Sequence, residues 1–93
     1  MIKFIKLSKV QRDSRFSLDE IWINESHVVR LQSAPEMKKL LEEGHMPQDL
    51  DKSHDFTSIT TNVGGITETH VVVGSAPAIA QRLSHDKRNL LKG

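Results

Sequence analysis

The stretch from Phe56 to Ser75, FTSITTNVGGITETHVVVGS, decides the fold of this chain. Two runs rich in Thr, Ile and Val flank Gly64 and Gly65, and these residue types branch at Cβ, which suits a pleated strand better than a helix. A two-residue Gly-Gly connection favours the positive-φ turns that match the twist of paired strands. The stretch therefore predicts a β-hairpin with one strand on either side of the glycine pair.

The turn also sets the register of the hairpin. Counting outward from it pairs Ile59 with His70 and Thr61 with Glu68. Glu68 and His70 lie two residues apart, so they project from the same face. A carboxylate beside an imidazole can act as a general-base pair, but no serine or cysteine stands out as a partner nucleophile, and there is no Gly-rich phosphate-binding loop. We interpret the pair as part of a surface face and predict no catalytic residue and no enzyme activity.

Further strands and two helices are expected outside the hairpin. Ser33, Pro35 and Glu36 resemble a capping box at the start of a helix that ends at Gly44. A second Ser-Ala-Pro sequence at residues 75–77 opens another helix, which either ends near His85 or continues through Leu91. Alternation of apolar and polar residues predicts the strands; with the two of the hairpin, they are Ile2–Leu7, Leu18–Asn24, His27–Gln32, Phe56–Val63 and Ile66–Val73.

A chain of 93 residues is expected to fold as one domain over residues 1–93, with residues 45–55 as a flexible loop and residues 86–93 as a basic tail that frays. Short connections between strands favour antiparallel pairing. We therefore predict a small α+β domain, with a four- to five-stranded, mainly antiparallel sheet and one or two short helices packed on one face.

Composition narrows the functional classes. The chain has no cysteine, which rules out disulfides and cysteine-ligated zinc and fits a cytoplasmic protein. The N-terminal MIKFIKL is too short and too interrupted by lysines for a signal peptide, and no run of about 18 apolar residues predicts a membrane span. We expect no cofactor and no contact with a membrane.

One segment contains residue types that bind metals. Imidazoles and carboxylates are ligands for zinc and other first-row metals. Their spacing, however, matches no established metal motif, and a flexible loop would lose entropy on ordering around an ion. We interpret the segment as a solvated loop and expect no metal site there. Its candidate ligands are His45, Asp49, Asp51, His54 and Asp55.

Charge is unevenly distributed along the chain. Residues 1–18 sum to +4, residues 19–55 to −5 and residues 56–93 to +2. Ordinary surface charge is one explanation, and a basic rim built from both termini that meets phosphates or an acidic partner is the other.

Trp22 points away from Ile21 and Ile23, and it either packs in a second layer of core or is exposed for a partner. The candidate interaction surface comprises Trp22, Lys3, Lys6, Arg82, Lys87 and Arg88.

The order of these features resembles the small bacterial proteins of the flagellar FlbD family and similar short uncharacterised proteins. The matching residues cover roughly two-thirds of the chain, and the segment from about Ser33 to Asp55 is an insertion relative to that pattern. The resemblance implies a non-enzymatic regulatory or assembly role in a bacterium and assigns no site residue. Its matching residues are Met1-Ile2-Lys3, Ile23-Asn24, Thr57 to Thr61 with Gly64-Gly65, and Val71-Val72-Val73 leading to Ser75.

The sequence therefore predicts a function in binding. The expected role is that of a small cytoplasmic protein-binding or assembly module, in which an exposed sheet edge is one means of self-association. The alternative is a nucleic-acid-binding regulator that uses the basic N- and C-terminal segments, and whose affinity depends steeply on salt.

Overall fold

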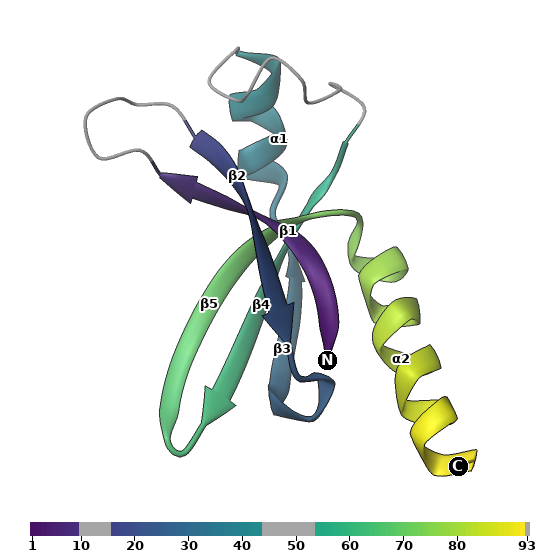
Figure 1. The fold of residues 1–93 in the computed structure, drawn as a ribbon. Helices are drawn as coiled ribbons and strands as arrows, with labels where there is room; N and C mark the ends of the chain where they lie inside the picture. Colours follow the sequence, from purple (N-terminus) through teal and green to yellow (C-terminus); the bar gives the residue numbers. More distant parts are fainter. Residues whose placement is uncertain (10–15, 44–53, 93) are drawn as a thin grey trace.

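The computed structural model describes residues 1–9, 16–43 and 54–92, which form a five-stranded antiparallel sheet and two α-helices (Figure 1). The strand order across the sheet is β2-β1-β5-β4-β3. The predicted α+β class with a mainly antiparallel sheet is confirmed. The elements in chain order are β1 (Ile2–Lys9), β2 (Phe16–Ile23), the 3-10 helix η1 (Glu25–His27), β3 (Val28–Ser33), α1 (Pro35–Glu42), β4 (Phe56–Val63), β5 (Ile66–Val73) and α2 (Ala76–Lys92).

The hairpin formed by β4 and β5 has the predicted bounds and the predicted register. Ile59 lies opposite His70, and Thr61 lies opposite Glu68. The φ angles are +59° at Gly64 and +85° at Gly65, so both residues occupy the left-handed region that a two-residue turn requires. The glycine pair therefore reverses the chain as the sequence predicts.

The first two strands are longer than expected. Their ladder continues to the pair of Lys9 and Phe16, beyond the predicted ends of the strands at Leu7 and Leu18. Phe16 and Leu18 pack against the buried Leu7 beneath α1. Burial of these side chains explains why pairing extends beyond the apolar residues of the first strand.

The two helices pack on opposite faces of the sheet, which corrects the expectation that they share one face. Ile79 and Leu83 of α2 join a cluster with Ile59 and Val72. Leu41 of α1 belongs to a second cluster on the other side of the sheet. Successive strand residues point to opposite faces, and the two clusters take alternate residues of β5. The second cluster contains Leu7, Ala34, Leu41 and Phe56, with Val71 and Val73 packed against it.

The three consecutive valines of β5 account for this arrangement. Val72 is fully buried on the α2 face, whereas Val71 and Val73 pack on the α1 face. An uninterrupted apolar run is typical of a strand that is covered on both sides. We name the face that carries Ile59 and Val72 the inner face, and the opposite face, which carries Val71, the outer face.

The two Ser-Ala-Pro sequences begin their helices differently. Ser75 accepts a hydrogen bond from the backbone N–H of Ala78 at 3.3 Å, as a capping serine does. The residue at the start of α1 is Ala34, which makes no side-chain capping bond, so the predicted capping role of Ser33 is wrong. Ser33 instead pairs with Thr57 as the last residue of β3. Of the two alternatives for the second helix, the structure shows the longer one, because α2 extends to Lys92.

The helix α2 is attached to β1 by an arginine. Arg82 donates a hydrogen bond from Nη2 to the carbonyl oxygen of Lys3 at 2.8 Å, and its guanidinium lies 4.6 Å from the centre of the Phe4 ring. Both interactions are favourable for a cation. Together with Ile79 and Leu83, they hold α2 against the inner face.

Candidate binding cleft and exposed tryptophan

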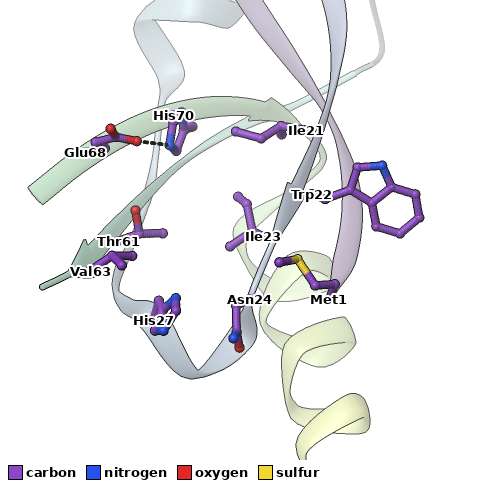
Figure 2. Close-up of a pocket in the computed structure, with 10 residues that line it drawn as sticks. All are labelled: Met1, Ile21, Trp22, Ile23, Asn24, His27, Thr61, Val63, Glu68 and His70. Carbon is purple, nitrogen blue, oxygen red and sulfur yellow. Dashed lines mark ion pairs between the residues drawn. The ribbon is translucent and has the colours of Figure 1, made fainter. Parts of the chain in front are cut away.

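A cleft of about 250 Å³ opens between β2 and the hairpin of β4 and β5 (Figure 2). Its apolar side is formed by β2, and its polar side by residues of the hairpin and η1. Small-molecule and peptide sites commonly combine an apolar wall with a few polar groups in this way. The cleft is lined by Met1, Ile21, Trp22, Ile23, Asn24, His27, Thr61, Val63, Glu68 and His70.

Alternation along β2 determines what faces the cleft. Figure 2 shows Ile21 and Ile23 pointing toward the hairpin, while the indole of Trp22 points away from it. Ile23 is buried and Ile21 packs against the same core cluster. The prediction that Trp22 projects opposite to its two isoleucine neighbours is therefore confirmed.

The connection between β2 and β3 closes one end of the cleft. Asn24 Oδ1 accepts hydrogen bonds from the backbone N–H and the hydroxyl of Ser26, at 3.0 and 2.7 Å. Glu25 is 8% exposed, and its carboxylate lies 3.3 Å from the terminal ammonium of Met1. These contacts fix η1 to the beginning of β1 and so set the position of His27.

Two side chains of β5, Glu68 and His70, contact each other on the hairpin side of the cleft. His70 Nε2 lies 3.4 Å from Glu68 Oε2, so the two residues meet on one face as the register predicts (Figure 2). The His70 side chain is 16% exposed and that of Glu68 is 63% exposed. The hydroxyl group that lines the cleft belongs to Thr61, which is buried opposite Glu68. This arrangement offers hydrogen-bond donors and acceptors to a ligand.

The outer face of β1 and β2 carries an exposed tryptophan. Trp22 is 60% exposed, so the structure shows the exposed alternative rather than a second layer of core. Trp22 lies directly opposite Lys3, and Ile5 lies directly opposite Glu20. Lys3 Nζ and Glu20 Oε1 are 3.6 Å apart. Two apolar and two charged side chains therefore form a compact group, which we name the Trp22 patch.

The predicted basic residues whose side chains the structure describes, Lys3, Lys6 and Arg82, are divided between the two faces of the sheet. Lys3 and Lys6 project from opposite faces of β1, because three residues separate them in a strand. Arg82 binds the carbonyl oxygen of Lys3 from the inner face. Lys87 and Arg88 belong to the last turns of α2, and their side chains lie outside the described part of the structure. Of the proposed interaction surface, the structure brings Trp22 and Lys3 onto one face.

The predicted metal ligands are only partly described. His45, Asp49 and Asp51 lie outside the described residues. His54 and Asp55 are exposed, and Asp55 Oδ1 forms an ion pair with Lys38 Nζ at 2.8 Å. Within residues 1–9, 16–43 and 54–92, no group of three or more His, Cys, Asp or Glu side chains is arranged to hold a metal ion.

The sequence predicted that Glu68 and His70 share one face of the hairpin, but it did not indicate the cleft. Asn24 and His27 come from the connection after β2, and no local pattern relates them to a hairpin that begins at Phe56, about 30 residues further on. Alternation in the sequence places Ile21 and Ile23 on the side of the strand opposite Trp22, but it does not show that they line a cleft. None of the helices in the described part of the chain has both the length and the apolar character needed to cross a bilayer.

Comparison with known proteins gives no assignment for the cleft or the Trp22 patch. No family model, no curated protein and no solved structure matches this chain. The resemblance to the FlbD family therefore stays a prediction, and function has to be argued from the surfaces themselves.

Proposed function

We propose that this chain is a non-enzymatic protein-binding module that contacts its partner through the Trp22 patch. The single observation that carries this proposal is the 60% exposure of Trp22, the chain's one tryptophan, on the paired strands β1 and β2. Tryptophan is enriched among the residues that dominate protein–protein affinity, because it buries a large area with little loss of conformational freedom. A bacterial regulatory or assembly role, as the FlbD resemblance implies, is compatible with such a module.

The composition of the patch fits an interface. Trp22 and Ile5 provide apolar area, while the Lys3–Glu20 ion pair provides polar groups beside them. Interfaces typically have an apolar centre and a polar rim. The same sheet face continues to Leu7 and Leu18, which pack in the cluster beneath α1. A partner bound at the patch would therefore lie next to this cluster and add to the apolar contacts on the same face.

The outer face of the hairpin offers no comparable surface. Thr60 and Thr69 lie opposite each other and share a hydrogen bond at 3.2 Å between their hydroxyls. Arg30 Nη2 donates to Gln32 Oε1 at 2.7 Å on the neighbouring strand. Polar side chains that already form hydrogen bonds with each other gain little binding free energy from contact with a partner. We therefore place the partner on the β1–β2 side of the outer face.

The nucleic-acid alternative has less support. Phosphate binding requires basic side chains that gather on one surface. Lys3 is paired with Glu20, Lys6 lies on the other face of β1, and Arg82 is engaged with β1 and the Phe4 ring. A titration with a mixed-sequence oligonucleotide at low salt tests it, and amide shifts confined to β1 and α2 would favour it over the proposed function.

The proposed function is tested by the variant Trp22→Ala. We expect the variant to weaken a complex found by sedimentation or pull-down at least tenfold, because truncating a central tryptophan typically costs about 2 kcal/mol or more. Its stability should stay within about 0.5 kcal/mol of the wild type, since the side chain is exposed. The matched control is Val29→Ala on β3, where an apolar side chain of 63% exposure is removed far from the patch.

Two results would contradict the proposed function. One is a protein that sediments as a monomer at all concentrations and recovers no partner. The other is an equal loss of binding in Trp22→Ala and Val29→Ala, because the effect would then not belong to the Trp22 patch.

A further inference from the structure

The cleft between β2 and the hairpin carries a net negative charge when its imidazole groups are neutral. Of the described residues that line it, Glu68 has the one acidic side chain, and none is a lysine or an arginine. The terminal ammonium of Met1, which also lines the cleft, is 3.3 Å from the carboxylate of Glu25. Further along the inner face, Asp19 lies directly opposite Lys6, so these two charges offset each other. The charge of Glu68 is therefore the one that a ligand in the cleft would meet.

Glu68 can bind a ligand while it keeps its contact with His70. His70 Nε2 approaches Oε2 of Glu68 at 3.4 Å, whereas a carboxylate has two oxygens and can accept about four hydrogen bonds. The side chain of Glu68 is 63% exposed, so its carboxylate is open to a ligand. Thr61 lies directly opposite Glu68 on β4 and adds a hydroxyl oxygen to the same side of the cleft (Figure 2). These oxygens accept hydrogen bonds, and an ammonium group supplies three N–H donors.

The other side of the cleft is apolar. Ile21 and Ile23 point from β2 toward the hairpin (Figure 2), and Val63, which is 52% exposed, adds an apolar side chain from the hairpin. Burial of a hydrocarbon chain against these side chains is favourable. The volume of about 250 Å³ lies below the roughly 300–1,000 Å³ of sites for drug-sized molecules, so the cleft suits a short chain. A ligand with one cationic end and one short apolar end matches both sides.

We propose that the cleft binds a small alkylammonium ligand, which is a primary amine on a short apolar chain. Its ammonium group donates hydrogen bonds to the carboxylate of Glu68 and the hydroxyl of Thr61, and its chain packs on the apolar side of the cleft. This inference goes beyond the proposed protein-binding function. It also uses a surface other than the Trp22 patch, because the indole of Trp22 points away from the hairpin (Figure 2), so each surface can fail its test without the other.

Pentylammonium tests this proposal at pH 8, where aliphatic amines are charged and imidazoles are generally neutral. During its titration into the ¹⁵N-labelled protein at constant ionic strength, we expect saturable amide shifts at Ile21 and Ile23 and across residues 61–70 of the hairpin. Pentanol has the same chain without the charge and should bind about tenfold more weakly, because hydrogen bonds between charged groups are the stronger ones. Pentanoate should give no saturable shift, because Glu68 repels its charge.

Variants of the protein test the two sides of the cleft separately. Glu68→Gln keeps the shape of the side chain, removes its charge and should weaken binding of pentylammonium about tenfold. The matched control is Glu20→Gln, which removes an exposed carboxylate 3.6 Å from Lys3 Nζ on the outer face and should leave binding unchanged. Val63→Thr keeps a residue that favours strands and should weaken binding severalfold, whereas Val29→Thr on β3 should leave it unchanged.

Several outcomes would overturn the proposal. Absence of saturable shifts, equal binding of pentanol, or equal binding by Glu68→Gln and the wild type would each do so. Saturable binding of pentanoate, or equal weakening by Glu20→Gln, would show that the charge of Glu68 does not select the ligand. If N-acetyl-lysine-N-methylamide bound more tightly than pentylammonium, the occupant would be a lysine side chain of a partner protein rather than a small molecule. Trp22→Ala should leave binding unchanged, and a loss in that variant would place the ligand on the Trp22 patch instead.

Discussion

Among the residues that the structure describes, Gly64, Gly65 and Gly74 have positive φ angles, and they separate the effect of backbone conformation from that of packing. At Gly64 and Gly65 a Cβ atom would meet nothing within 4 Å, so a substitution there changes only the conformational preference of the chain. At Gly74, φ is +135° and a Cβ atom would lie 3.1 Å from Cδ1 of the buried Ile79. A side chain at Gly74 would therefore both strain the backbone and lie too close to the core residue Ile79.

We expect substitutions at these glycines to follow a definite order in urea unfolding. Gly64→Asn should be nearly neutral, because asparagine followed by glycine is favoured in this turn. Gly65→Ala should lower the free energy of unfolding by about 1–2 kcal/mol, the cost of left-handed backbone for a residue with a Cβ. Gly74→Ala should lower it further. A Gly74→Ala protein as stable as the wild type would show that the link between β5 and α2 is placed differently.

At the scale of elements, two identical triplets have different roles. Ser33-Ala34-Pro35 and Ser75-Ala76-Pro77 both precede a helix, but only Ser75 caps one with its side chain. We expect Ser75→Ala to lower the free energy of unfolding by about 1 kcal/mol, the usual cost of losing a capping hydroxyl. Ser33→Ala should change it by no more than a few tenths. Thermal unfolding followed by circular dichroism measures both, and equal effects would contradict the assignment.

The same triplets show what the sequence can predict and what it cannot. Local chemistry predicted both helix starts, the hairpin turn and the pairing of Ile59 with His70, because neighbouring residues determine each of these. It could not determine whether Ser33 ends a strand or caps a helix, because the answer depends on Thr57, which pairs with it from β4. The cleft was missed for a related reason, since its walls come from segments that tertiary packing brings together.

At the scale of the whole molecule, β4 and β5 connect two apolar clusters. Phe56 is 2% exposed on the α1 face, and Ile59 is fully buried on the α2 face three residues later. Neither helix covers both clusters, yet the two clusters share these strands. Loss of either cluster would expose one face of the central sheet, so the two should depend on each other for stability.

We therefore expect residues 1–93 to unfold as one domain. Ile59→Ala should lower the free energy of unfolding by about 2–5 kcal/mol, a large part of the roughly 5–15 kcal/mol typical of small proteins. The milder variants Ile59→Val and Phe56→Leu disturb one cluster each. For both variants, the NMR signals of Leu41 in α1 and of Leu83 in α2 should disappear at the same urea concentration, because each cluster needs the shared strands. If Phe56→Leu shifted the midpoint for Leu41 but not for Leu83, the clusters would unfold independently, and the chain would consist of two cooperative units.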